Sequence, residues 1–566
     1  MDDRLAGLVP YPRSVQARPG RLDLTSRPSV TPQGGDPDTV AAAVAVQHLL
    51  AGIPWPDGMS AEQVSCGVSI DTKLDPEGYQ LTIESDGIMI TGGSAAGSRY
   101  AAQTLLQLLP SDAFRAAVVP SANWWLPWAH IEDAPTLPWR GAHIDVARHF
   151  FGKRELLALI DALAALKLNR LHLHLTDDQG WRIESLLHPA LHEIGSHRSR
   201  TRISLNDEQP KVYEEIPYGG YYTLTDLAEI SAFAAQRGMA LVPEIDLPGH
   251  STALLAAMPE LGSGAPPAGG YQVSPDWGIL PSLLAPLPES MTVLRDVFGE
   301  LLGATGAQLV HIGGDECVLD SWRSDPRIDA CRRDRGLATA DDLHAAFLRD
   351  LADMLANDFG ARAVVWDEGF MSSKTGAGEL RDDTIVMAWR GMDIARQAAE
   401  AGHDVVAVPV LPTYFDYYQE RGETEPVAIG GPIRVQDVAA FAPVPGEWSD
   451  EARSNLIGTQ FQVWTEYIRD NRSLEYMVFP RACALAEVAW SGQPAPWADT
   501  EASRPALQDR VGAHLRRLDA AGLAYRPLAG PRPWQQGGNG PRRHRPGYLV
   551  QDVAVYLDQL TGNEAL

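Results

Sequence analysis

From about residue 137 onward, short apolar segments alternate with longer segments in which apolar residues recur every three to four positions. Apolar runs of strand length are typical of buried parallel strands, and the three-to-four spacing is typical of amphipathic helices. The strand-like runs cover 142–146, 170–175, 240–245, 309–312, 363–366, 385–389, 405–410 and 456–463. The helical runs cover 154–166, 225–237, 291–302, 342–355, 394–401 and 476–488, and the seventh helix is weakly marked. This alternation predicts an α/β fold, a closed (β/α)8 TIM barrel.

Two further regions flank the predicted barrel, which spans 137–495. In residues 1–136, the alternating segment 79–84, an Asp86-Gly87 turn and the apolar segment 88–90 predict a β-hairpin, and 98–109 predicts a helix. This region carries no cluster of catalytic residue types, so we expect a small non-catalytic α+β domain. After a Pro-rich break at 492–496 come a helical run at 507–518 and an apolar run at 548–560. Residues 496–566 are therefore predicted to form a C-terminal appendage of helical and irregular structure.

The charge balance argues against a polyanionic partner. Lys and Arg number 47 against 73 Asp and Glu, which gives a net charge of -26. A surface that binds nucleic acid needs local positive charge. The one basic run, 542–545, lies among Pro and Gly near the C-terminus and is typical of a solvated tail. We therefore expect no nucleic-acid partner, and the sequence does not reveal the oligomeric state.

Segments that target a chain to membranes or the exterior are not found in this sequence. The first fifteen residues lack an apolar stretch of signal-peptide length, and no stretch of about 18 apolar residues occurs. We expect no membrane partner and a cytoplasmic location, or secretion if a leader has been trimmed. The four cysteines include no C-x-x-C pair and indicate neither a disulfide framework nor a zinc site.

The residues that follow the predicted strands carry the candidate chemistry, because the active site of such a barrel lies at the carboxyl ends of its strands. Most are carboxylates and tryptophans. Indole faces cover the apolar faces of pyranose rings, and carboxylates accept hydrogen bonds from sugar hydroxyls. The pattern therefore predicts a carbohydrate site. The residues are Asp145, Arg148, His149, Asp177, Asp178, Glu244, Asp246, His250, Asp315, Glu316, Trp366, Asp367, Glu368, Trp389, Arg390, Tyr414, Asp416, Trp464 and Glu466.

Three local patterns, two in this set and one within a strand, leave alternatives. Consecutive strand residues point to opposite faces, so Asp315 and Glu316 reach one ligand only if the strand end is irregular, which the preceding Gly313-Gly314 permits. His172 and His174 form an H-x-H pair that suits either a metal or, as we favour, two packed or hydrogen-bonded imidazoles. Arg148 is equally compatible with a surface arginine and with a guanidinium fork that grips vicinal hydroxyls.

Several segments together resemble the family 20 glycoside hydrolases, the β-N-acetylhexosaminidases. The segment 311–316, HIGGDE, is similar to their signature. Further similar segments occur in the family's order along the whole barrel, and the first region resembles the family's N-terminal α+β domain. Val318 departs from a proline common in the family, and 284–288 lacks its usual turn, which bears on leaving-group preference. The further segments are 139–141, 145–150, 171–178, 243–250, 366–368, 414–416 and 464–466.

The resemblance implies an exo-acting, retaining reaction in which the 2-acetamido group of the substrate attacks its own anomeric carbon. Asp315 would stabilise the resulting oxazolinium ion, Tyr414 would donate to the acetamido oxygen, and Glu316 would be the acid and base. His250 would bind Glu316 and be oriented by Asp177. Neither cofactor nor metal is implied, and the substrate would be an amino-sugar oligosaccharide or glycoconjugate with terminal GlcNAc or GalNAc. The implied substrate-binding residues are Arg148, Asp246, Trp366, Trp389, Asp416, Trp464 and Glu466.

Three other functions are compatible with parts of this pattern. A two-carboxylate glycosidase would use Glu316 as acid and Glu368 or Glu244 as nucleophile. A carbohydrate-binding protein without activity could share the fold, although loss of Asp315 or Glu316 would be expected there. A metal-dependent amidohydrolase would use His172 and His174.

Overall fold

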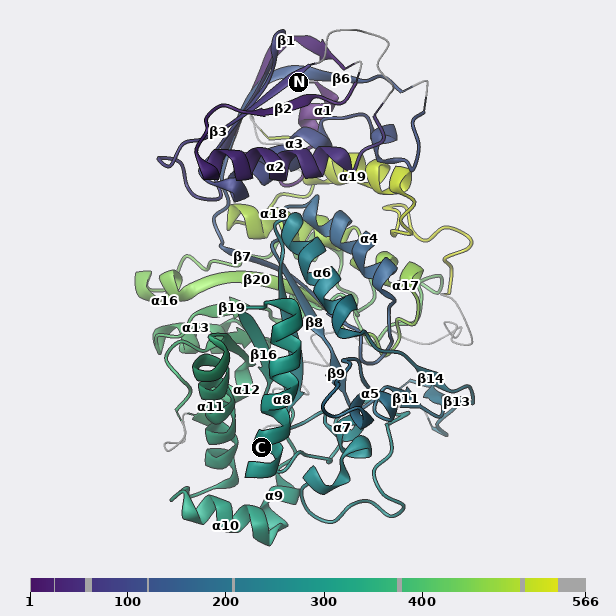
Figure 1. The fold of residues 1–566 in the computed structure, drawn as a ribbon. Helices are drawn as coiled ribbons and strands as arrows, with labels where there is room; N and C mark the ends of the chain where they lie inside the picture. Colours follow the sequence, from purple (N-terminus) through teal and green to yellow (C-terminus); the bar gives the residue numbers. More distant parts are fainter. Residues whose placement is uncertain are drawn as a thin grey trace.

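The structure, a computed structural model, describes residues 2–24, 26–55, 64–119, 122–205, 209–373, 379–498 and 504–537. Its centre is a closed barrel of parallel strands in the order β15-β16-β17-β18-β19-β20-β7-β8, which confirms the predicted barrel. The N-terminal domain lies at one end of the barrel, with α19 (Leu507–Ala521) between the two (Figure 1). None of the described helices is long and apolar enough to cross a membrane.

The barrel strands are buried on both faces, as their apolar sequences require. Each predicted strand is present with ends shifted by at most a few residues. β7 begins three residues before its predicted start. β19 stops three residues before its predicted end, at Ala407, because Pro409 precedes a short helix, α14 (Val410–Thr413). The strands are β7 (Trp139–Asp145), β8 (Arg170–His174), β15 (Ala240–Leu247), β16 (Leu309–Gly313), β17 (Arg362–Trp366), β18 (Ile385–Ala388), β19 (Val405–Ala407) and β20 (Leu456–Val463).

Most barrel helices match the predicted periodic segments. The exceptions are one predicted helix that is divided in two and the connections after β17 and β19, which contain only short helices. The predicted helix at 476–488 is instead two helices, α17 (Asn471–Val478) and α18 (Arg481–Ser491), because Pro480 cannot donate a helical hydrogen bond. After β17 the chain forms only α12 (Asp367–Ser373), and after β19 only α14, α15 (Val435–Ala439) and α16 (Asp450–Asn455). The matching helices are α4 (Lys153–Ala164), α6 (Leu224–Gln236), α8 (Pro288–Thr305), α11 (Ala340–Phe359) and α13 (Met392–Glu400).

The N-terminal domain is a six-stranded sheet in the order β1-β6-β4-β5-β3-β2, packed against α2 (Pro37–Ala51) and α3 (Ala95–Gln107). The predicted hairpin is confirmed: β4 (Tyr79–Glu84) pairs antiparallel with β5 (Gly87–Gly92), and Ile83 faces Ile88. Alternate residues of β4 are buried, so one face of the sheet meets the helices. The other strands are β1 (Ser14–Asp23), β2 (Ser29–Pro32), β3 (Ser65–Ile70) and β6 (Trp125–Asp133).

Helix α19 confirms the predicted helical run at 507–518 and contacts both domains. Arg517 donates to the carbonyls of Gly7 and Gln107, and Arg510 donates to the carbonyl of Leu8 and to Glu487 of α18. These bonds join the chain's first residues, α3 and the barrel. The predicted apolar run at 548–560 and the basic run at 542–545 lie outside the described residues.

A buried ion pair joins the N-terminal domain to the barrel. It lies at the amino ends of the barrel strands, opposite the carboxyl ends that carry the candidate site residues. Lys167, in the loop before β8, donates to Asp133 at the end of β6 (3.0 Å) and to the hydroxyl of Tyr79 (2.9 Å). Asp133 also accepts from the indole of Trp490 on α18 (2.9 Å). The Lys167 and Asp133 side chains are 1% and 0% exposed, so each charge depends on the other.

We expect Lys167→Ala to lower the free energy of unfolding by about 3–5 kcal/mol, because it leaves Asp133 as an uncompensated buried charge. Chemical unfolding measures the change. The matched control is Arg295→Ala, which removes an exposed pair with Asp358 and should cost no more than ~1 kcal/mol. The double variant Lys167→Met/Asp133→Asn should lose less than Lys167→Ala alone, and equal losses in all three variants would contradict the account.

Candidate active site

The end of β16 has an irregular backbone that brings two consecutive carboxylates to one place. Gly313, Gly314 and Glu316 have φ angles of 69°, 100° and 50°, in the left-handed region. The Nε2 atom of His250 lies 3.8 Å from Asp315 Oδ2 and 3.5 Å from Glu316 Oε2. The predicted irregular strand end is therefore confirmed, and both side chains converge on one imidazole.

The glycine at position 313 is required by space as well as by conformation. A Cβ atom at Gly313 would lie 1.7 Å from Asp246 Oδ1, far inside any permitted contact. Asp246 stands near the end of the neighbouring strand β15, so the absence of a side chain at 313 lets two strand-end carboxylates pack together.

His250 links the paired carboxylates to a further buried acid. Its Nδ1 atom lies 3.3 Å from Asp177 Oδ1, while its Nε2 atom faces Asp315 and Glu316. Burial alone would lower the pKa of His250, but Asp177 above all raises it well above its ordinary value. The cationic form of the imidazole is therefore favoured, with a hydrogen bond to Asp177 on one side and ion pairs to Asp315 and Glu316 on the other.

Asp177 is itself held by two cations. Its Oδ2 atom lies 2.7 Å from Arg148 Nη2 and 2.8 Å from His174 Nε2. Burial would raise the pKa of Asp177, but Arg148 and His250 hold it well below its usual range. Arg148 is therefore no surface arginine: its guanidinium also donates to Gln179 (3.0 Å) and lies over the indole of Trp464. Only the guanidinium N–H groups of Arg148 that do not bond Asp177 or Gln179 are available to a substrate.

Asp315 and Asp246 are buried carboxyls with unused hydrogen-bonding capacity. Asp315 Oδ1 and both oxygens of Asp246 have no hydrogen-bond partner among the residues that the structure describes. Burial, and then Asp246, raise the pKa of Asp315 well above its usual range, and burial and Glu244 raise the pKa of Asp246 to about 7. Unmet buried acceptors cost about 1–3 kcal/mol each, so a ligand that brings N–H groups or positive charge would stabilise them.

Tyr414 stands across the barrel mouth from these acids. An isolated parallel bridge to Gln462 holds it beside β20, and its hydroxyl is hydrogen-bonded to Trp464. Burial raises the pKa of the Tyr414 phenol well above its ordinary value, and Asp416, Asp367 and Asp315 raise it further. Tyr414 therefore remains a protonated donor at neutral pH.

The three predicted tryptophans occupy two levels. Trp389 and Trp464 are partly exposed at the barrel mouth, where a ring face can meet a ligand. Trp366 is 1% exposed and lies one level deeper, with its indole N–H donating to Glu244 (2.9 Å) and its ring close to that of Trp464.

Asp416 and Glu466 complete the rim next to Arg148. Burial, and then Glu466, raise the pKa of Asp416 well above its usual range. Burial also raises the pKa of Glu466, and Arg148 opposes the effect. Asp416 Oδ1 has no hydrogen-bond partner among the described residues. Two carboxyls and one guanidinium can thus exchange hydrogen bonds with several hydroxyls at this side of the site.

Neither carboxylate of the two-carboxylate alternative is placed as a nucleophile. Glu244 is 0% exposed inside the barrel, in contact with histidines and Trp366. Both oxygens of Glu368 are occupied, one by the indole N–H of Trp389 and one by Arg390, each at 2.9 Å. Glu368 therefore fixes an aromatic wall. Gln179 and Arg390, which orient Arg148 and Glu368, were not singled out for these roles. The available signal was that Gln179 directly follows the strand-end acid Asp178 and that Arg390 directly follows the strand-end residue Trp389.

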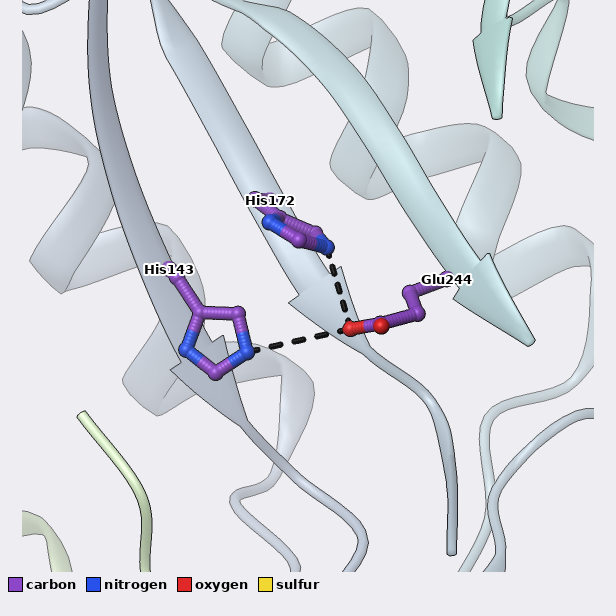
Figure 2. A group of neighbouring side chains, drawn as sticks. All are labelled: His143, His172 and Glu244. Carbon is purple, nitrogen blue, oxygen red and sulfur yellow. Dashed lines mark ion pairs between the residues drawn. The ribbon is translucent and has the colours of Figure 1, made fainter. Parts of the chain in front are cut away.

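The H-x-H pair lies inside the barrel, where His143, His172 and Glu244 form a close group (Figure 2). Gln460 accepts from the indole of Trp139 through Oε1 and donates to His172 Nδ1 (3.0 Å). The proton of neutral His172 is therefore on Nε2, which faces Glu244 Oε2 at 3.0 Å. A protonated nitrogen is a donor and not a metal ligand, so the hydrogen-bonded interpretation fits the pair better than the metal interpretation.

A closed barrel whose mouth carries paired acids and partly exposed indoles is typical of a glycoside hydrolase, and the family match bears this class out. Residues 137–493 match the catalytic domain of glycosyl hydrolase family 20, and residues 6–134 match domain 2 of that family. The chain belongs to glycosyl hydrolase family 20, the β-N-acetylhexosaminidases.

Relatives and solved structures agree with this membership. A β-N-acetylhexosaminidase of Cellulomonas fimi is 32% identical over 528 residues, covering 89% of this chain and 95% of the relative. A β-hexosaminidase of Porphyromonas gingivalis is 34% identical over 439 residues, covering 76% of this chain and 53% of the relative, so the chain spans about half of that protein. The Streptomyces plicatus N-acetyl-β-hexosaminidase superposes with a TM-score of 0.71 at 28% identity, covering 92% and 96% of the two chains.

Gly313→Ala should displace Asp246 and the Asp315-Glu316 turn, because the new Cβ would occupy the position of Asp246 Oδ1. We expect kcat/KM on an aryl N-acetylhexosaminide to fall by about 10²-fold or more, as for a misplacement of roughly 1 Å. Gly306→Ala is the matched control: its φ is 64°, and nothing lies within 4 Å of a Cβ there. It should cost only the ~1–2 kcal/mol of left-handed strain and leave kcat/KM unchanged. Equal activity of the two variants would contradict the packing account.

Proposed function

We propose that this chain is an exo-acting, retaining β-N-acetylhexosaminidase that releases terminal β-linked GlcNAc or GalNAc by substrate-assisted catalysis. The observation that carries the proposal is the convergence of Asp315 and Glu316 on His250, with Glu244 buried and Glu368 occupied. The site thus offers Glu316 as an acid–base carboxylate and Asp315, with an unpartnered oxygen, beside it, whereas neither candidate protein nucleophile, Glu244 or Glu368, is free to attack C1. A nucleophile supplied by the substrate resolves this shortage.

In the first step, the carbonyl oxygen of the 2-acetamido group attacks C1 while the bond from C1 to the leaving oxygen breaks. Glu316 donates its proton to that oxygen. The amide becomes a cationic oxazolinium ring, whose N–H donates to Asp315 and whose charge favours the ionised form of that buried carboxyl. The Tyr414 hydroxyl donates to the acetamido oxygen and holds it in place for attack.

In the second step, the carboxylate of Glu316 takes a proton from water, and the oxygen of that water attacks C1 as the oxazolinium ring opens. Two inversions at C1 give net retention. His250 is kept cationic by Asp177 and lies 3.5 Å from Glu316. Its positive charge stabilises the Glu316 carboxylate each time that carboxylate forms.

The remainder of the rim supports action on a terminal sugar. Asp416, Glu466 and the free part of the Arg148 fork provide hydrogen bonds for ring hydroxyls, and Trp389 and Trp464 provide aromatic walls. Hydroxyls that are grasped in this way cannot carry a further sugar. A GH20 exo-β-N-acetylglucosaminidase from Vibrio harveyi, solved with N-acetylglucosamine, superposes with a TM-score of 0.74 at 28% identity over 94% of this chain and 79% of that chain.

Hydrolysis of a panel of 4-nitrophenyl β-glycosides tests the proposed activity. We expect turnover of the GlcNAc or GalNAc glycosides and none of the glucoside or galactoside, which lack the acetamido nucleophile. Comparable turnover of the glucoside would contradict the proposal and favour the two-carboxylate alternative.

Asp315→Asn should lower kcat for 4-nitrophenyl GlcNAc by ~10²–10³-fold, the usual cost of losing one preorganised electrostatic group. A thiazoline analogue of the oxazoline should inhibit the wild-type protein strongly, since it imitates the charged intermediate, and should inhibit this variant far less. Asp367→Asn is the control, because Asp367 is also buried at a strand end but accepts from the backbone of Arg390. If thiazoline inhibited both variants as it does the wild type, Asp315 would not be the group that opposes the charge.

A further inference from the structure

The acid–base chain at the rim continues into the barrel beyond Asp177. His174, the last residue of β8, lies between two buried carboxylates: its Nε2 is 2.8 Å from Asp177 Oδ2 and its Nδ1 is 2.6 Å from Glu244 Oε2. With Asp177 to His250 at 3.3 Å and His250 to Glu316 at 3.5 Å, five side chains form one continuous series. The series runs from the barrel core to the proposed acid, and its charges alternate in sign.

Glu244 ends the series as a buried anion. It is 0% exposed, and its second oxygen accepts from the indole of Trp366 (2.9 Å) and lies 3.0 Å from His311 Nδ1. Burial would raise the pKa of Glu244, but His311 and His174 hold it well below its usual range. Figure 2 shows how its carboxylate extends from β15 toward the imidazoles of the neighbouring strands.

Among the described imidazoles inside the barrel, those of His143, His172, His174 and His311, only His174 has a carboxylate on each side. Burial would lower the pKa of His174, but Glu244 and Asp177 raise it well above its ordinary value. By contrast, burial lowers the pKa of His172 to about 4 and that of His143 well below its usual range. Arg148 Nη1 lies 3.4 Å from His174 Nε2. The rings of His143 and Trp464 pack against the imidazole of His174. Buried ion pairs of this kind seldom add net stability, so folding alone does not explain the arrangement.

We propose that His174 and Glu244 are positioning residues for the acid–base action of Glu316. This inference rests on the proposed function. His174 fixes Asp177 as an anion with Oδ1 directed at His250, and Glu244 fixes His174 from below. His250 is thereby held as a cation beside Glu316, and its charge stabilises the carboxylate that remains when Glu316 gives up its proton. No proton has to travel along the series; its members supply fixed, oriented charge.

The test compares two leaving groups within one enzyme sample. We take kcat/KM for a 2,4-dinitrophenyl GlcNAc glycoside, whose leaving group needs little protonation, and for a 4-methoxyphenyl glycoside, whose leaving group needs an acid. The ratio of the two values does not depend on the folded fraction of the sample. In His174→Gln we expect a loss of ~10–100-fold on the 4-methoxyphenyl substrate, by analogy with residues that orient metal ligands, and little loss on the other. Glu244→Gln, which keeps the shape and removes the charge, should change the ratio in the same direction.

The matched control is His143→Leu. His143 is a fully buried imidazole in register with His172 on the neighbouring strand. Its Nε2 lies 3.8 Å from Glu244 Oε2, and its ring nitrogens have no hydrogen-bond partner among the described residues. Its replacement should leave the ratio unchanged. In a Glu316→Gln background, His174→Gln should cause no further loss, because the group through which it acts is gone.

Equal losses on both leaving groups in His174→Gln and Glu244→Gln, or a full additional loss in the Glu316→Gln background, would overturn the inference and make the pair merely structural. These results are distinct from failure of the proposed function, which would appear as absent turnover of both GlcNAc glycosides by the wild-type protein. If His174→Gln does not fold, Glu244→Gln alone decides by the same ratio.

Discussion

The site depends on one backbone constraint: two consecutive residues at the end of a strand must face the same ligand. A regular strand directs Asp315 and Glu316 to opposite sides. Left-handed φ angles at Gly313, Gly314 and Glu316 turn both carboxyls toward His250. This turn requires glycine at position 313, because the carboxyl group of Asp246, on the neighbouring strand, occupies the space that a Cβ atom would need. The packing of two strand ends therefore decides which groups meet the substrate.

Charge is arranged around this turn in alternation. Asp177 lies between cations, and His250 and His174 each lie between carboxylates. The groups closest to the proposed reaction differ, because Asp315, Asp246 and Asp416 are buried with unmet acceptors and raised pKa values. The charges of His250, Asp177 and His174, which support Glu316, are thus fixed by the protein. In the proposed reaction, the protonation state of Asp315 depends on the bound substrate.

The sequence was sufficient for the barrel because parallel strands buried on both faces give uninterrupted apolar runs, and all eight were found. It was less informative after the fifth and seventh strands, where short helices carry little periodicity, and at 476–488, where the pattern continued across Pro480. The strand-end rule placed Asp315, Glu316, Asp177 and His250 together, and the family resemblance implied the contacts of His250 with Glu316 and Asp177. The groups behind Asp177, which hold its charge, were not readable. The pairing of Arg148 with Asp177, the depth of Trp366 and the place of His174 between two carboxylates depend on side-chain directions from different strands.

The central claim is that the nucleophile belongs to the substrate and not to the protein. It is tested most directly with 4-nitrophenyl GlcNAc glycosides whose acetamido methyl group carries none, one, two or three fluorine atoms. Each fluorine withdraws electrons from the carbonyl oxygen and weakens it as a nucleophile while changing the size of the group little. If the acetamido oxygen attacks C1, kcat/KM falls steeply with each fluorine added. A kcat/KM that is independent of fluorine content would contradict the account and require a nucleophile from the protein.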